Sequence, residues 1–121
     1  MRFYWTMPQG LKAHYRRELD LYKLEFARQD FPHAWQHLER AHILAQAWPR
    51  EHSYVHWRML LFGIHIKSGH EILGQIPRLL VGGVKSFVGK IPVGNTGGAN
   101  VPPLQPMEIP GDLETLLDAY R

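Results

Sequence analysis

The chain has 121 residues and a mass of 14.1 kDa, which is the size of one folded domain. Its 14 Lys and Arg against 11 Asp and Glu leave a formal charge of +3, too small and too mixed in sign to predict a nucleic-acid partner. Cysteine is absent, which excludes a disulfide scaffold, a thiolate metal site and a cysteine nucleophile. The unusual feature is a set of eight histidines, all between His14 and His70.

The start of the chain lacks the apolar segment and the small-residue cleavage site of a secretory signal. The longest apolar runs are interrupted by charged residues or histidine, and they are too short to span a bilayer. We therefore expect a cytoplasmic protein without a membrane partner.

Two helices are predicted in the first part of the chain, over residues 8–28 and 32–47. In the first, apolar residues recur at steps of four and three, the spacing of one buried helical face: Tyr15, Leu19, Tyr22 and Phe26. Between the helices, Asp30 is a suitable N-cap and Pro32 suits a first turn. The inner face of the second helix carries Trp35, Leu38, Ala41, His42 and Ala45.

Two further helices are predicted over residues 51–68 and 70–88. The third is apolar on every side from Met59 to Ile64, which predicts a central helix covered by its neighbours. Pro77 predicts a kink in the fourth. Because the connections are short, we expect successive helices to be antiparallel neighbours, as in bundle or tetratricopeptide-like hairpins.

Residues 89–111 are rich in Gly and Pro, which excludes a regular helix, but they are too apolar for a solvated linker. We expect an ordered strap across the helices, followed by a short helix over residues 112–119. The predicted fold is a compact all-α domain, residues 1–121, with four antiparallel helices, a C-terminal strap and a short terminal helix.

The second predicted helix carries Glu39 and His42, three residues apart on its inward face. An inward Glu and His must be paired, hydrogen-bonded or ligated, because burying them bare is costly. The Glu-x-x-His spacing is also the one by which bundle helices offer a carboxylate and an imidazole to one metal ion.

The third predicted helix carries His52 and His56, four residues apart and therefore on one face. The zinc-protease helix has the same spacing but places Glu directly after its first His. Here Ser53 occupies that position, so the general base of that enzyme class is missing. The alternative is a pair of partly exposed histidines near a helix start.

The two helices should bring these side chains together, because His42 lies near the end of one helix and His52 near the start of the next. Three imidazoles and the Glu39 carboxylate could then bind zinc, iron, copper or manganese. Glu18 on the first helix could complete or bridge such a site, and His14, one turn earlier, could bind the metal or hydrogen-bond to Glu18. The alternative for Glu18 is a solvated carboxylate paired with a basic residue.

Other histidines are expected to lie away from this site. His33 and His37 are predicted to be at the surface, on the opposite side of the second helix. His65 lies about 180° around the third helix from His56 and cannot share its site.

Several segments together resemble a small uncharacterised bacterial family of all-helical proteins. The resemblance rests on His37-Leu-Glu-Arg-Ala-His42, His52-x-x-x-His56-Trp57-x-Met59, Glu71-Ile-Leu-Gly-Gln-Ile, Pro92-Val-Gly-Asn-Thr-Gly-Gly and Pro106-Met-x-Ile-Pro110. It covers the chain from about Glu18 to Leu117. Some members are associated with heavy-metal resistance gene neighbourhoods, which implies a link to metals. Within the shared motifs, the resemblance implies a functional role for Glu39, His42, His52 and His56.

The sequence therefore predicts a transition-metal-binding protein, either a metal-dependent enzyme or a metal-stress accessory protein. It leaves open whether the site is catalytic, and it names no substrate. The alternative is a metal-free helical interaction module that binds an acidic peptide or protein partner. The apolar fourth helix and strap could also support a homodimer.

Overall fold

Four α-helices make up most of the part of the chain that the computed structural model describes, residues 6–67, 71, 75, 76 and 107–120. They are α1 (Gln9–Ala27), α2 (Phe31–Ala45), α3 (Pro49–His65) and α6 (Gly111–Asp118). Within these residues there is no β-strand, so the predicted all-α class is confirmed.

The predicted fourth helix and strap fall mainly on segments outside the described residues. Within the predicted fourth helix, Glu71, Gln75 and Ile76 are described, and each has a helical conformation.

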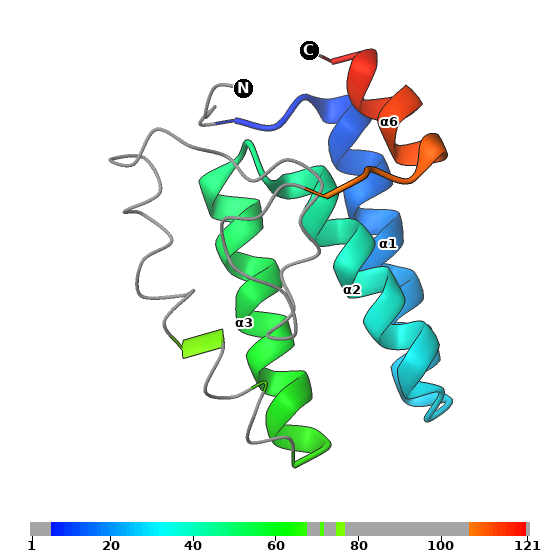
Figure 1. Cartoon of the computed structure of the whole chain (residues 1–121), viewed down its shortest axis with the longest axis vertical. Coiled ribbons are helices and arrows are strands. Elements are labelled where there is room, and N and C mark those ends of the chain that lie inside the picture. The colour runs from blue at the N-terminus through cyan, green and yellow to red at the C-terminus, as the bar shows by residue number, and fades with distance from the viewer. Residues whose placement is uncertain (1–5, 68–70, 72–74, 77–106, 121) are drawn as a thin grey trace.

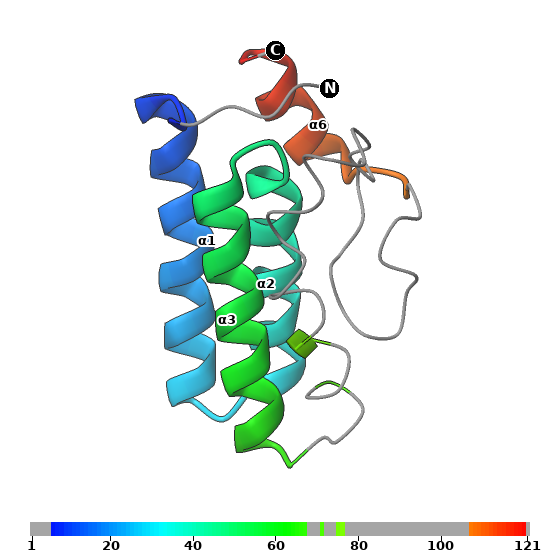
Figure 2. The same ribbon diagram turned by 90° about the vertical axis from the view of Figure 1, so that its left-hand side faces the viewer.

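The three long helices lie side by side, and each runs antiparallel to the one before it (Figures 1 and 2). The connections explain this arrangement, because residues 28–30 and 46–48 are all that separate successive helices. α1 and α3 consequently run in the same direction. The short helix α6 lies beside the start of α1 and the end of α2 (Figure 1).

The helix boundaries follow from local chemistry. Asp30 caps α2 as predicted, since its carboxylate accepts a hydrogen bond from the His33 backbone N–H at 3.4 Å, and Pro32 lies in the first turn. Pro49 begins α3, two residues before the predicted start, because a proline in the first turn forfeits no helical hydrogen bond. Beyond the end of α3, Lys67 adopts a left-handed conformation with φ of 58°.

The core is built from the faces that the periodicity predicted. Leu11, Leu38, Val55 and Met59 are fully buried, and each such side chain contributes about 1.5–3 kcal/mol of hydrophobic stabilisation. An aromatic group closes one end of the bundle, where rings pack at centroid distances of 4.7–5.9 Å: Phe26, Phe31, Trp35, Phe62 and His65.

Among the described helices, α2 is the central one. Helix α2 packs against α1, α3 and α6, whereas Trp57 and Ile64 of α3 are 48% and 53% exposed. The prediction that α3 is covered on every side is therefore wrong. Its apolar residues exceed what one buried face requires, and part of the surplus faces solvent.

Helix α6 is attached to the bundle by two leucines and one arginine. Leu113 and Leu117 are buried against the core. The guanidinium of Arg40 donates to both carboxylate oxygens of Asp112, and its Nε donates to Glu18 Oε1 at 2.9 Å. The hydrogen bonds from Arg40 lower the pKa of Asp112. Arg40 thus connects α1, α2 and α6.

Replacing Arg40 should destabilise the fold more than replacing Asp112. Glu18 is buried, so Arg40→Ala would remove the guanidinium that pairs with its carboxylate beside His37 and cost about 1–3 kcal/mol. Asp112 is exposed, so Asp112→Ala should cost about 0.2–1 kcal/mol. Urea unfolding followed by circular dichroism measures both values, and equal losses would contradict this division of roles.

The Arg40–Asp112 ion pair should also respond to acid in one direction. Because Arg40 lowers the pKa of Asp112, the pair stabilises the fold at pH values above the ordinary carboxyl range and loses its effect as the pH falls through the lowered pKa. The unfolding midpoints of wild type and Asp112→Ala should therefore converge in strong acid.

Candidate metal centre

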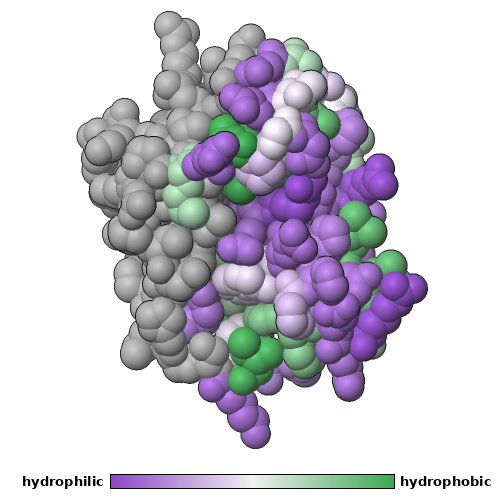
Figure 3. Space-filling model, turned by 45° about the vertical axis from the view of Figure 1, so that its right-hand side comes forward, coloured by the Kyte–Doolittle hydropathy of each residue, from purple (hydrophilic) through white to green (hydrophobic). Residues whose placement is uncertain are grey.

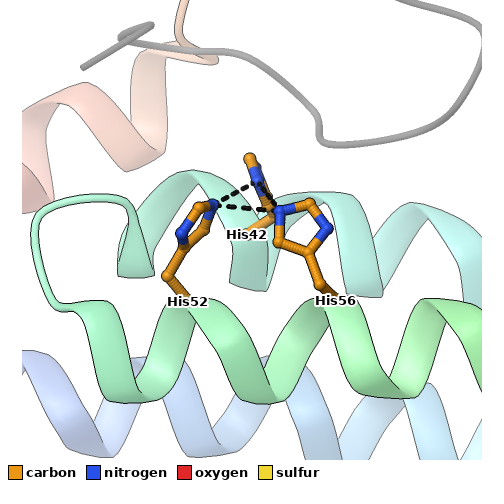
Figure 4. Close-up of side chains that lie close together, drawn as sticks. All are labelled: His42, His52 and His56. Carbon is orange, nitrogen blue, oxygen red and sulfur yellow. Dashed lines mark hydrogen bonds between the residues drawn. The ribbon is translucent and has the colours of Figure 1, made fainter. Parts of the chain in front are cut away.

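Three buried imidazoles meet between α2 and α3 (Figure 4). His42, His52 and His56 are each no more than 2% exposed. The Nε2 atoms of His42 and His52 lie 2.8 Å apart, and the other two Nε2–Nε2 distances are both 3.1 Å. The predicted convergence of the three histidines is confirmed.

Helix geometry explains how the histidines come together. His52 and His56 are one turn apart on α3, so their side chains project from the same face. His42 lies in the last turn of α2, and the short connection to α3 places that turn beside the first turns of α3. The three rings point from these two helices toward a common point (Figure 4).

The separations fit the donor set of a transition-metal ion. Two nitrogens bound to one tetrahedral zinc ion at bonds of about 2.0–2.1 Å lie about 3.3 Å apart. The observed separations of 2.8–3.1 Å are only slightly shorter, so small outward movements would let all three nitrogens reach one ion. Imidazole nitrogens suit zinc, copper, iron and nickel.

The hydrogen-bonding groups of neutral imidazole also favour a shared cation. A neutral imidazole has one N–H donor and one lone pair. Lone pairs that face each other at about 3 Å repel unless a proton or a metal ion lies between them. The arrangement of the three Nε2 atoms is therefore suited to a shared cation.

Gln75 determines which nitrogen of His56 faces the other two histidines. The His56 Nδ1–H donates to Gln75 Oε1 at 2.6 Å, which leaves the Nε2 lone pair directed at the cluster. The Gln75 amide is oriented in turn, since its Nε2 donates to Glu71 Oε2 at 3.0 Å and contacts Met59 Sδ at 3.6 Å. Gln75 is fully buried, so its hydrogen bond to His56 is shielded from water.

Glu39 and Glu18, the carboxylates predicted as ligands, do not belong to the group formed by the three histidines. Among the described residues, the group that could hold a metal consists of the three histidines without a carboxylate. Glu39 lies half-buried on α2, one turn before His42. Glu18 lies instead in an ion-pair cluster with Arg40 and His37, whose Nδ1 is 2.9 Å from Glu18 Oε2.

The remaining described histidines lie outside the cluster. His14 is exposed on α1. His33 binds the Asp30 carboxylate at 2.7 Å, and His65 packs its ring against Phe26. His37 reaches the surface only in part, with 22% of its side chain exposed, and its Nδ1 contacts Glu18.

The sequence analysis missed Gln75 as a functional residue. A glutamine has no distinctive ligand chemistry, and its role depends on where the chain after α3 packs. The one available signal was the Glu71-Ile-Leu-Gly-Gln segment, because Glu and Gln four residues apart can hydrogen-bond along a helix.

None of the described helices has the length and hydropathy needed to cross a membrane. The face that Figure 3 brings forward is mainly hydrophilic over the described residues, and hydrophobic side chains form small separate groups there.

Comparisons with known proteins agree with the resemblance drawn from the motifs. The model of a family described as "Protein of unknown function (DUF3703)" matches residues 9–117. No curated protein and no solved structure matches the chain. Because the family match covers nearly the whole chain, the protein belongs to the DUF3703 family.

Proposed function

We propose that this protein binds one transition-metal ion through the Nε2 atoms of His42, His52 and His56. The observation that carries the proposal is the meeting of three buried imidazole nitrogens within 3.1 Å of one another. Buried imidazoles must be hydrogen-bonded or ligated, and these three direct one nitrogen each toward a common point, which is the arrangement that a single ion would satisfy.

Charge favours a fourth, anionic ligand. Three neutral imidazoles leave a divalent ion with its full charge in a buried site, which is costly unless an anion or hydroxide balances it. Glu39 is the carboxylate we propose for this position, since it lies one helical turn before His42. Glu18 is engaged by Arg40 and His37, so we assign it to the ion-pair cluster.

The imidazole donors also predict an order of affinity among metal ions. Zinc, copper and iron accept imidazole readily, whereas manganese prefers carboxylate and water oxygens. We therefore expect tighter binding of zinc or copper than of manganese. A role in metal stress is the biological setting that the family resemblance implies, and the cytoplasm is the location that we propose for it. An ion with one position left for water could also activate that water.

Metal titration of protein purified without a histidine tag tests the proposal. Isothermal titration calorimetry with zinc should give one ion per chain, and His42→Ala and His56→Ala should each abolish or severely weaken this binding. His33→Ala and His65→Ala are matched controls, because they remove exposed histidines outside the cluster. Unchanged binding in the cluster variants, or no binding of zinc, copper or iron to wild type, would refute the proposal.

Glu39→Gln and Glu18→Gln separate the roles of the two carboxylates. The Glu39 variant should weaken zinc binding while the fold stays intact, because it removes the anionic ligand and keeps the side-chain shape. The Glu18 variant should leave zinc affinity close to wild type and lower stability instead, because Glu18 bridges Arg40 and His37. The reverse pattern would assign the ligand role to Glu18.

Replacing Gln75 should weaken metal binding without removing a ligand. The amide orients His56 through Nδ1, and loss of such a partner typically lowers metal affinity about 10–100-fold. Gln75→Leu should show this loss in the zinc titration, with Gln36→Leu as an exposed control on α2. An affinity equal to wild type would show that Gln75 does not position His56.

Metal should also raise the stability of the fold. An ion that binds only the folded chain, supplied at 100 times its dissociation constant, adds about 2.7 kcal/mol. The midpoint of thermal unfolding should rise with zinc and fall back with a chelator. The His56→Ala variant should show no such shift.

A further inference from the structure

Helix α3 carries a second apolar face that nothing in the core requires. Tyr54, Trp57 and Ile64 are 39%, 48% and 53% exposed, and Leu61 between them is partly buried. These four residues, called here the α3 stripe, follow one another at steps of three, four and three. This spacing places them in one line along the helix and is the pattern by which a helix packs against another helix.

The α3 stripe faces away from the metal centre. At about 100° per residue, Tyr54 and Leu61 lie about 160° and about 140° around the helix from His56, and Trp57 lies about 100° from it. Substitutions in the stripe therefore leave the three histidines untouched, and the two features can be tested separately.

The charges beside the stripe are basic. Along α3, the charged side chains that reach solvent are Arg50 at the start and the partly exposed Arg58. The one acidic residue of this helix, Glu51, is buried. No exposed carboxylate of α3 balances these two cations.

A groove between α1 and α3 extends this basic region. It has a volume of about 430 Å³, and Tyr54 of the stripe forms part of its wall. Four cationic side chains line it, against the carboxylates of Asp20 and the buried Glu51: Lys12, Arg16, Lys23 and Arg50. α1 and α3 lie alongside each other on this side of the molecule (Figure 2).

The basic charge beside the stripe favours an acidic helix over a second copy of this chain. In a symmetric pair of two copies, the interface would gather the arginines of both helices, and α3 offers no exposed carboxylate to pair with them. A helix with leucine-like residues on one side and Asp or Glu beside them would bury its apolar side on the stripe and pair its carboxylates with the basic side chains.

We propose that the α3 stripe and the adjoining groove bind an acidic amphipathic helix of a partner protein. This surface is independent of the metal function proposed above. Trp57 provides the largest exposed apolar side chain of the stripe, and aromatic and arginine side chains are the types that most often dominate binding energy at interfaces. Arg50 stands at the end of the stripe and at the groove, so it contributes to both parts of the surface.

A designed peptide serves as the probe. It is a labelled helix of about 18 residues with leucines at i, i+3, i+4 and i+7 spacing and glutamates beside them. The comparison peptide carries lysine in place of every glutamate. Fluorescence anisotropy with the full chain should show binding of the acidic peptide that weakens with added salt, and at least tenfold weaker binding of the basic peptide.

Variants of exposed residues locate the binding surface. Trp57→Ser and Arg50→Glu should each weaken binding of the acidic peptide about tenfold or more. Leu24→Ser is the matched control, because Leu24 is a similarly exposed apolar residue on α1 outside the stripe and groove. His56→Ala should bind the peptide as wild type does, which separates this test from that of the metal site.

Three results would overturn the proposal. Equal binding of the two peptides would remove the charge argument, and absence of binding at millimolar concentration would remove the surface. Sedimentation showing a dimer of the chain that Trp57→Ser dissociates would assign the stripe to a second copy instead.

Discussion

Three imidazole nitrogens are held within 3.1 Å of one another, away from water, in an arrangement that could hold one metal ion. This arrangement is imposed by the α2–α3 hairpin, because its short connection leaves the last turn of α2 facing the first turns of α3. The rings are buried to 2% exposure or less, so close packing allows them only small movements. The centre is therefore built into the scaffold, which is the condition under which a few side chains can select an ion geometrically.

The polar interior is divided into two networks with different chemistry. One links the three histidines to Gln75 and Glu71, and its hydrogen bonds leave the lone pair of His56 Nε2 directed at the cluster. The other links Glu18, His37, Arg40 and Asp112, and its ion pairs hold α6 against α1 and α2. Both networks contain Glu and His, yet only the first arranges nitrogen lone pairs around a common point. The presence of an arginine in the second supplies the positive charge that a metal would supply in the first.

This division explains what the sequence could and could not predict. Helical spacing and a short connection were enough to bring His42, His52 and His56 together, because each step involves neighbouring turns. The partner of Glu18 depends on which residue of α2 faces α1 across the interface, and Arg40 reaches that place through a long side chain. Spacing within one helix carries no information about that contact. Gln75 was missed for the same reason, since its contact with His56 joins separate elements.

The error about α3 has a physical origin as well. An apolar run on every side of a helix indicates burial only when enough neighbours exist to cover it. Here α2 takes the central place, since it contacts α1, α3 and α6. Helix α3 uses one side for Val55, Met59 and Phe62 in the core and for the histidine cluster, while Trp57 and Ile64 face solvent. Exposing a tryptophan and an isoleucine on one helix gains nothing for the stability of the isolated fold. Folding alone does not account for the α3 stripe, and its place around the helix means that the stripe and the histidine cluster share one helix without sharing a residue.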